Sequence, residues 1–479
     1  MKQSILISPD AFEPSKHWYP KALNATIHPM VAFFLNLSQE RIVQRYCHLN
    51  PMVKPDDLMK WMKYQPKHFY WAGTDLIHVT SEQGKRQMVV IETNSCPSGQ
   101  KSMPLLDDNL EMGGYEILMR ETFKPLLKAR RLPEGDLAVI YDKNPMEASG
   151  YAAAMASVFR ENVHFIPFYS QADEQNVRLN ESGVLEFVDE SGNWKPLRAV
   201  FRYLTQKPWN RLPIKSKTFI FNPIIACLAG GRNKMVASKA YEFFNAEIAE
   251  SNLKIFTPET IWDVSKNEVP LWVQKMGGQA VIKIPYSNAG QGVFTIVNQQ
   301  ELDNFMAKDY EYDQFIVQSL IGNYWWSSNT QEGRFYHVGT MPDKKGESFA
   351  ADVRMMLRST KDGFKPLAIY ARKAAAPLLD HLDSGANSWQ ILGTNLSVKL
   401  DQNQWSSDTD RLLLMDRRDF NRLGVGLDDL IQGYIQTLLA TIAIDKMAVN
   451  FIGTKGALKQ KLFRSLNNDQ ALIDEIMVS

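Results

Sequence analysis

A strand, a helix and a second strand follow one another between residues 137 and 168, and this order most restricts the fold of the chain. Residues 137–141 have the continuous apolar character of a buried strand, and an alanine-rich helix is expected over 149–161. Residues 163–168 form the second strand. Two strands joined through a helix in this way pair in parallel. The chain must therefore contain a sheet with parallel strands.

The segments on both sides of this β-α-β unit follow other patterns. Residues 1–70 look largely helical, with helices expected over 29–47 and 56–63 and prolines as punctuation. Further helices are expected over 109–130, 234–250 and 428–445. Further strands are expected over 76–80, 88–93, 177–188 (a hairpin), 199–203, 280–284, 293–296, 314–318, 334–341, 349–357, 366–372 and 447–452. The sequence thus predicts an α+β/α/β fold.

The bulk properties of the chain exclude several classes of protein. A length of 479 residues predicts two to four subdomains, each with its own core. A net charge of +1 gives no electrostatic case for binding nucleic acid or an anionic membrane. Three cysteines fit a reducing compartment and provide neither a disulfide framework nor a zinc cluster. With no signal-peptide pattern and no apolar stretch long enough to span a bilayer, we expect a cytoplasmic protein.

A short hairpin over 280–296 is the first indication of nucleotide binding. Two apolar runs flank a loop that contains Gly290 and Gly292, and Lys283 lies inside the first run. Glycines let backbone N–H groups approach an anion closely, and the lysine adds a positive charge, so the pattern suits a lid over phosphates. An ordinary hairpin whose lysine reaches solvent is the alternative. The pattern matches neither a dinucleotide fingerprint nor a P-loop.

A second hairpin, near the N-terminus, carries oxygen ligands. Asp75 opens it, and Glu92 and Asn94 share one face where its second strand ends. Two such oxygen ligands suit Mg²⁺, which shares few protein ligands with phosphate oxygens and water. An edge strand with a solvated polar face is the alternative. The loop over 95–102 could cradle an anion or merely turn the chain.

Other charged residues stand at the ends of expected elements. Lys234 opens a helix, where its charge opposes the helix dipole, and either a bound phosphate or a solvated first turn explains it. Residues 315–320 read as a strand that runs into a connector, which could offer backbone groups to an adenine edge. Asp352 and Arg354 share a face of one strand, and Arg372 ends the next. Each alone is more typical of a protein surface.

The order of these residues over about 230–452 resembles the ATP-grasp superfamily. In that family two lysines contact ATP phosphates, a hinge strand holds adenine, and arginines face the transferred phosphate or the acyl-phosphate. The resemblance implies ATP as a cofactor, held by Lys234, Lys283, Ser287, Gly290, Gln291, Gly292, Gln318, Ser319 and Leu320. It assigns catalytic roles to Lys283, Arg354 and Arg372.

One departure from the usual ATP-grasp order points to a permuted chain. The family usually ends with a strand that bears an acid and then Glu-x-Asn, which bind Mg²⁺. Residues 447–452 resemble the first strand, but Asn450 stands where the acid is expected and no Glu-x-Asn follows. The missing pair resembles residues 73–75 and 90–97. This is similar to circularly permuted ATP-grasp enzymes related to glutathione and glutathionylspermidine synthetases, and it implies Mg²⁺ ligands at Asp75, Glu92, Asn94 and Asp352.

The resemblance also implies a division into four parts. Residues 1–130 would form a helical segment with the permuted metal-binding hairpin, and 131–225 a Rossmann-like pre-ATP-grasp domain. Residues 226–320 would form the lid subdomain, and 321–479 the C-terminal ATP-grasp subdomain. Candidate substrate contacts are Ser98, Gln100, Lys101, Arg202 and Asn395.

The function implied by the resemblance is an ATP-dependent carboxylate–amine ligase. It would form an amide or peptide bond through an acyl-phosphate and release ADP and phosphate. Two alternatives stay open: an ATP-grasp phosphotransferase, and a nucleotide-binding regulator without catalysis. The expected partners are small-molecule carboxylates and amines, with no nucleic acid and no membrane, and the chain could act alone or as a homodimer.

Overall fold

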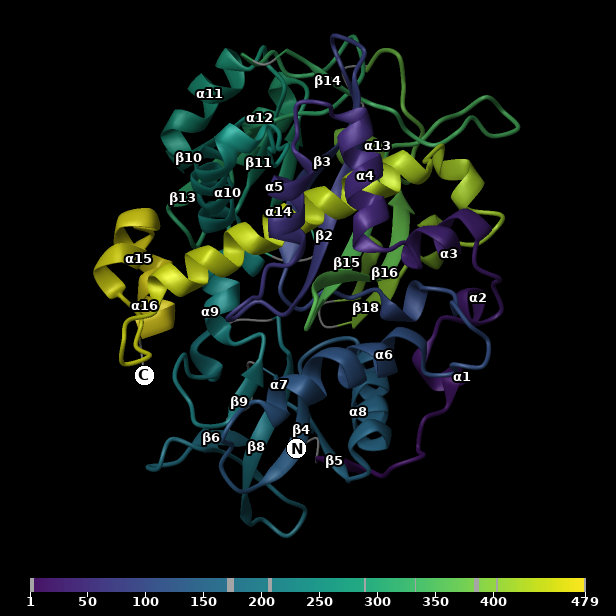
Figure 1. Ribbon diagram of the computed structural model, residues 1–479. Helices are drawn as coiled ribbons and strands as arrows, with labels where there is room; N and C mark the ends of the chain where they lie inside the picture. The colour runs from purple at the N-terminus through teal and green to yellow at the C-terminus, as the bar shows by residue number, and fades with distance from the viewer. Residues whose placement is uncertain are drawn as a thin grey trace.

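The computed structural model describes residues 4–169, 176–205, 209–287, 290–331, 333–382, 387–401 and 404–477. Its strands form three large sheets and a two-stranded ribbon, with helices packed against them (Figure 1). One large sheet contains parallel strands and the other two are antiparallel, so the predicted mixed α/β class is confirmed. Within these described ranges, no helix has both the length and the apolar character needed to cross a membrane.

The seven-stranded sheet contains the predicted β-α-β unit and lies at the bottom of Figure 1. Strand β4 pairs in parallel with β5 and with β8, and β8 pairs in parallel with β9. Helix α8 (Pro145–Phe159) connects β4 to β5, and its alanines pack on the sheet. The strands are β1 (Ile5–Ile7), β5 (Val163–Pro167), β4 (Asp136–Tyr141), β8 (Trp194–Tyr203), β7 (Leu185–Val188), β6 (Val177–Leu179) and β9 (Phe219–Phe221).

The predicted glycine hairpin belongs to a four-stranded antiparallel sheet at the upper left of Figure 1. Its order is β10 (Thr260–Ser265), β13 (Gln314–Ser319), β11 (Ala280–Lys283) and β12 (Val293–Ile296). Helices α11 (Val269–Lys275) and α12 (Gln299–Met306) contribute apolar residues to the core of this sheet. The four-stranded sheet and its two helices thus form a small unit with its own core, which suits the predicted lid.

The central six-stranded sheet joins hairpins that are far apart in the sequence. Strand β2 pairs on one side with β3 and on the other with β15, which continues into β16. The strands are β14 (Phe335–His337), β2 (Trp71–Ser81), β3 (Arg86–Asn94), β15 (Ala351–Thr360), β16 (Gly363–Lys373) and β19 (Leu412–Leu413). The ribbon of β17 (Ser397–Asp401) and β18 (Gln404–Ser407) lies outside this sheet.

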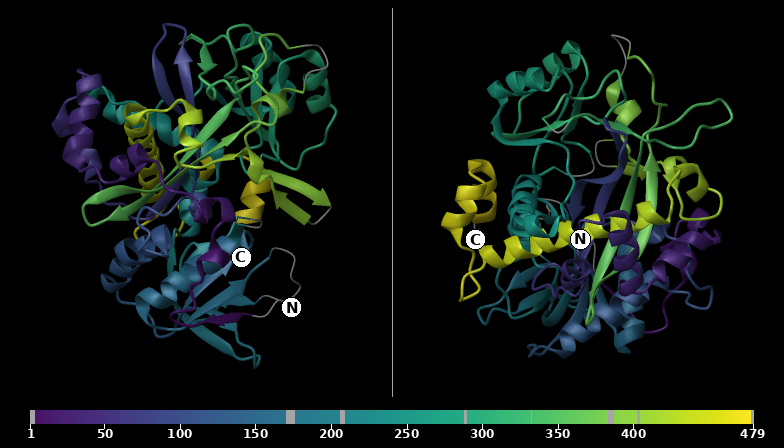
Figure 2. Two further views of the ribbon diagram at one scale, coloured as in Figure 1. Left: turned by 90° about the vertical axis from the view of Figure 1, so that its right-hand side faces the viewer. Right: turned by 45° about the horizontal axis from the view of Figure 1, so that its top comes forward.

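A long helix, α14 (Leu427–Phe451), crosses the molecule and packs on the central sheet (Figures 1 and 2). Most of its residues are buried, and its side chains belong to the largest apolar core. The remaining helices are α1 (Pro14–His17), α2 (Pro20–Leu23), α3 (Pro29–Leu35), α4 (Gln39–Leu49), α5 (Pro55–Met62), α6 (Gly113–Leu118), α7 (Lys124–Lys128), α9 (Ile224–Ala226), α10 (Lys234–Ile248), α13 (Ser388–Leu392), α15 (Gln460–Leu466) and α16 (Gln470–Met477).

The strand predicted over 447–452 is wrong, because residues 447–451 form the end of α14 and Ile452 is its C-cap. Ile444, Met447, Ala448 and Phe451 are all buried, and their spacing of three and four residues continues one helix face. The short apolar run fits a strand equally well when it is taken alone. Asn450 lies exposed on the helix surface, so the comparison of this segment with a metal-binding strand does not hold.

The helix predicted over 29–47 is divided in two. Helix α3 ends before Asn36, and Ser38 begins α4 by accepting a hydrogen bond from the backbone N–H of Arg41 through its Oγ. Such an N-cap satisfies a backbone donor that the first helical turn leaves open. The Asn-Leu-Ser sequence at 36–38 is therefore a helix stop and a new start.

Candidate functional site

A cavity of about 1150 Å³ lies where the three large sheets meet. Residues from β2, β3, β15 and β16, from the lid hairpin and from the end of β4 line it. Of the residues predicted for the site, fifteen line this cavity: Asp75, Glu92, Asn94, Ser98, Lys101, Lys283, Gly290, Gln291, Gln318, Ser319, Leu320, Asp352, Arg354, Arg372 and Asn395. Side chains that are up to about three hundred residues apart thus share one space.

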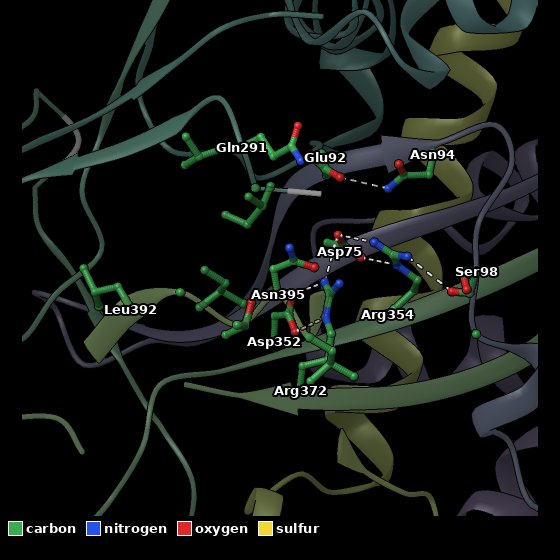
Figure 3. Close-up of a pocket in the computed structure, with 18 of the residues that line it drawn as sticks. Asp75, Glu92, Asn94, Ser98, Gln291, Asp352, Arg354, Arg372, Leu392 and Asn395 are labelled. Atoms are coloured by element: carbon green, nitrogen blue, oxygen red, sulfur yellow. Dashed lines mark hydrogen bonds and ion pairs between the residues drawn. The ribbon is translucent and has the colours of Figure 1, made fainter. Parts of the chain in front are cut away.

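Two arginines and two acids on the central sheet form a buried ion-pair network (Figure 3). Sheet register brings Asp75 opposite Arg354, and Asp352 opposite Arg372. Arg354 donates from Nε and Nη2 to the two carboxylate oxygens of Asp75, at 2.5 and 2.6 Å. Arg372 donates from Nε to Asp352 at 2.9 Å, and its Nη2 lies 3.0 Å from Asp75. Bidentate pairs of this kind fix each guanidinium plane.

Charge in this network is compensated within the protein. Burial opposes the charge on Arg354, but Asp75 outweighs it, so the pKa of Arg354 lies above its ordinary value. Burial likewise opposes the charge on Arg372, and Asp352 and Asp75 hold its pKa well above the ordinary value. Burial raises the pKa of Asp352 although Arg372 opposes this effect. The two guanidiniums therefore stay cationic and fixed at the cavity wall.

A second charged group surrounds Glu92, on the neighbouring strand. Its carboxylate lies 3.4 Å from Nζ of Lys234 and accepts a 3.0 Å hydrogen bond from Nδ2 of Asn94. Burial would raise the pKa of Glu92, but Lys234 and Arg354 hold it well below its ordinary value. Burial lowers the pKa of Lys283 to about 8, although Glu92 opposes this effect. This group places an acid, an amide and two lysines around one part of the cavity.

The hairpin of β11 and β12 reaches the cavity, where Gly290 and Gln291 of its loop line the wall. Lys234 donates from Nζ to the backbone oxygen of Ser287 at 2.7 Å, which ties the loop to the start of α10. Gly290 has φ +75°, and a Cβ there would lie 2.9 Å from the ring of Trp389. Only glycine accommodates both the backbone and the close ring. Residues 288 and 289 lie outside the described residues.

The predicted adenine connector is hydrogen-bonded inside the protein. The N–H of Ser319 donates to Glu259 O at 2.8 Å, and the N–H of Leu320 donates to Ser328 Oγ at 2.7 Å. These two backbone donors are therefore already used. The apolar side chains beside the connector that line the cavity are Ile77, Ile91, Pro258, Val281, Leu320 and Ile321. Apolar walls of this kind suit a flat aromatic base.

The loop after β3 is held firmly against the cavity. Ser98 O accepts from Nη1 of Arg354 at 3.2 Å and from the hydroxyl of Tyr370 at 2.9 Å. The buried carboxylate of Glu147 accepts from Ser98 Oγ and from the N–H groups of Gly99 and Gln100, at 2.9 to 3.1 Å. The loop is thus a rigid part of the wall.

Two predicted substrate contacts do not line the cavity. Arg202 is buried and donates from Nε to Asn222 O at 2.6 Å and from Nη1 to Leu204 O at 3.1 Å, so it supports backbone. The Gln100 side chain is buried against Gly114. Lys234, Ser287 and Gly292 also lie outside the lining, although Lys234 borders a small hollow beside Glu92 and Lys283.

The sequence analysis missed the cavity residues that follow β4. These are Asp142, Lys143 and Asn144, with Thr205 beyond β8 and Arg232 before α10. Ligands of parallel sheets bind beyond the carboxyl ends of the strands, so the position directly after a predicted parallel strand was the available signal. Tyr370 and Trp389 were missed as well, and no sequence pattern marks them.

The residues present fit a magnesium ion that is held mainly by phosphate oxygens. Glu92 and Asn94 both line the cavity and each carries a side-chain oxygen, and Mg²⁺ in nucleotide sites often takes only one or two protein ligands. Asp75 and Asp352 fit less well, since arginines engage their carboxylates. Across the described part of the chain, no group of three or more His, Cys, Asp or Glu forms a metal site without such help.

Solved structures similar to this chain have low sequence identity to it. No family model matches the chain, and no curated protein matches its sequence. A glutathione synthetase-like effector from Globodera pallida aligns over 72% of this chain and 82% of its own, at 10% identity and a TM-score of 0.39. A RimK domain ATP-grasp protein from Sphaerobacter thermophilus aligns over 49% and 90%, at 12% identity and a TM-score of 0.29. D-alanyl-alanine synthetase A from Vibrio cholerae aligns over 50% and 89%, at 9% identity and a TM-score of 0.26.

Proposed function

We propose that this protein is an ATP-dependent carboxylate–amine ligase that releases ADP and phosphate. One observation carries the proposal: Lys283, Glu92 and Asn94 share one cavity with Arg354 and Arg372. Such a set can hold the phosphates of a nucleotide and neutralise charge on a transferred phosphoryl group. The proposal rests on this arrangement of side chains and not on the likeness to solved structures.

The two lysines would hold the nucleotide phosphates beneath the lid. Lys234 and Lys283 come from α10 and β11, so they fix the lid hairpin and the phosphates with respect to each other. Glu92 and Asn94 would hold Mg²⁺, which neutralises phosphate charge when it is bound. Lid closure excludes water, which protects a reactive acyl-phosphate from hydrolysis.

The arginines would act on the transferred phosphoryl group. A substrate carboxylate oxygen attacks the γ-phosphorus, and the bond from phosphorus to the ADP oxygen breaks. An amine nitrogen then attacks the acyl carbon, phosphate leaves, and the amine loses a proton. Asp75 and Asp352 hold Arg354 and Arg372 in place at the cavity wall, so positioning and charge provide the catalysis.

The position of the N-terminal hairpin supports a permuted arrangement. Strands β2 and β3 bring Asp75, Glu92 and Asn94 beside the arginine strands β15 and β16. These residues precede the lid hairpin in the chain, as circular permutation requires. A homodimer and a cytoplasmic location remain predictions.

Replacing Lys283 by methionine should abolish ADP formation while the protein stays folded. The substitution removes the phosphate contact and leaves an apolar side chain of similar length in a buried position. The measurement is an ADP-release screen with Mg²⁺-ATP and amino acids and amines, singly and in pairs. Loss of at least about a hundredfold in rate is expected, since charge stabilisation of this kind contributes several kcal/mol.

The exposed Lys361 provides a matched control, because Lys361→Gln removes a lysine charge outside the cavity. Equal rates for Lys283→Met and Lys361→Gln would contradict the proposal.

Product analysis tests the reaction type: a ligase gives free phosphate and an amide in equal amounts. A stable phosphoester without free phosphate would identify a phosphotransferase instead. Nucleotide binding without turnover under any substrate pair would identify a regulator.

A further inference from the structure

The cavity is larger than the nucleotide part of the proposed function needs. Ligand pockets for one small molecule are usually about 300 to 1000 Å³, and this cavity measures about 1150 Å³. Its far end lies beyond β4 and β8, where Asp142, Lys143, Asn144 and Thr205 line it together with Arg232. The proposed phosphate and arginine groups use none of these five residues.

Two cations dominate this end of the cavity. Lys143 and Arg232 both line the space, and the nearby carboxylate of Asp142 already pairs with Arg211 at 2.8 Å. Asp142 also accepts two hydrogen bonds from the N–H of Thr205, at 2.9 and 2.8 Å. The carboxylate of Asp142 is therefore engaged by groups of the protein itself.

Lys143 is half-buried and is held loosely. Its Nζ donates a long hydrogen bond of 3.3 Å to the backbone oxygen of Cys96, and the ring of Tyr203 lies 5.3 Å away. Burial and then the charge of Arg232 lower the pKa of Lys143 to about 7. Both cations line the same cavity and Arg232 acts against the charge of Lys143, so an anion bound beside them would favour the charged lysine.

Different groups act on the two lysines of the cavity. The charges that act on Lys283 are those of Glu92, Lys234 and Asp75. Those that act on Lys143 include Arg232, Asp142 and, more weakly, Arg354. Lys143 therefore has other charged neighbours than the proposed phosphate lysine Lys283.

We infer that Lys143 and Arg232 form a subsite for an oxyanion group of the second substrate, a carboxylate or a phosphate that does not react. The inference deepens the proposed ligase function and rests on it for the identity of the other ligand. It assigns the substrate class: a small molecule that carries a fixed negative charge in addition to its reacting group. Lys143 is a binding residue in this account and not the base.

Calorimetric titration of the wild-type protein with simple probes tests the subsite. Glutarate and inorganic phosphate are the anionic probes, and 1,5-diaminopentane is a cationic probe of the same length as glutarate. Each is titrated with and without Mg²⁺-ADP. Binding of either anion supports the inference, and the better of the two identifies the oxyanion. Binding of the diamine in place of both anions would overturn it.

Variants at Lys143 distinguish a specific subsite from general charge. Lys143→Gln should lower the affinity for the anionic probe roughly ten- to hundredfold, as expected for a lost charged hydrogen bond. Lys143→Arg should retain the affinity of the wild type. Lys361→Gln should bind it like the wild type. Removing a half-buried charge that is held loosely should not lower the midpoint of thermal unfolding, so Lys143→Gln stays testable. Equal probe affinity in Lys143→Gln and wild type would overturn the inference.

Proton uptake gives an independent readout. Arg232 and Arg354 lower the pKa of Lys143, whereas Cys96 and Asp142 raise it. A bound anion would raise this pKa further. At pH 8, probe binding should therefore take up protons, which titrations in two buffers of different ionisation enthalpy measure. Lys143→Arg should take up none.

If Mg²⁺-ADP fails to bind but the anion binds, the proposed function fails and the subsite stands. If Mg²⁺-ADP binds and neither anion does, the subsite alone fails.

Discussion

At the residue scale, Asp445 on α14 shows how a buried carboxylate can serve structure alone. Its oxygens accept hydrogen bonds from the N–H groups of Lys67, His68 and Phe69, at 2.7 to 3.1 Å, and from the Tyr64 hydroxyl at 2.8 Å. These groups lead into β2, which carries the acid of the arginine network. Lys143 is the contrast, a half-buried charge that lines the cavity and donates one long hydrogen bond to the backbone of Cys96.

Replacing Asp445 by alanine should lower the free energy of unfolding by about 3 kcal/mol or more. The substitution leaves several buried donors without an acceptor, and each such group costs about 1–3 kcal/mol. Urea unfolding followed by circular dichroism measures the change. Asp410→Ala is the control, because Asp410 is exposed. A loss no greater than that of the control would contradict the structural role of Asp445.

At the scale of elements, the pairing of β2 with β15 unites two hairpins and builds the arginine network. The β15–β16 hairpin carries both arginines but only one of the two acids, Asp352, and Asp75 on β2 is the acid that pairs with Arg354. Sheet pairing and ion pairing therefore support each other.

Replacing Asp75 by alanine should destabilise the protein by about 3–5 kcal/mol, because it leaves buried guanidinium charge uncompensated. The double variant Asp75→Ala with Arg354→Met should recover much of that loss. A double-mutant cycle on unfolding free energies measures the coupling. Additive effects of the two substitutions would show that the two strands are not coupled through this pair.

Local patterns predicted most elements, and contacts between distant segments explain what they missed. The β-α-β unit and both hairpins follow from apolar periodicity and turn residues, which act over a few positions. Residues 447–452 were misassigned because a six-residue apolar run does not separate strand from helix, and only the buried face of α14 decides it. Arg202 was assigned to the cavity because its contact with Asn222 O is not visible in the sequence.

At the scale of the whole molecule, the cavity belongs to no single sheet. Its wall combines the ends of the seven-stranded sheet, the lid sheet and the central sheet. A ligand that fills the cavity contacts all three sheets. Its binding should therefore stabilise the arrangement of the sheets relative to one another. The views in Figure 2 show how these parts surround one central region.

Mg²⁺-ADP should raise the free energy of unfolding by about 2.7 kcal/mol when its concentration is a hundred times the dissociation constant. Thermal unfolding with increasing nucleotide measures this linkage, and Lys283→Met should show little of it. Lys361→Gln should follow the wild type. A melting temperature that is independent of nucleotide concentration in the wild type would exclude binding in the cavity.

The composite central sheet has a consequence for synthesis of the chain on the ribosome. The β2–β3 hairpin ends at Asn94, whereas its partner β15 begins only at Ala351. At ribosomal speeds of about 5–20 residues per second, roughly ten to fifty seconds separate the two. During that time the free edge of β2 is open to pairing with other nascent chains. A holding chaperone, or slow completion of the sheet after release, would therefore set the yield of active protein.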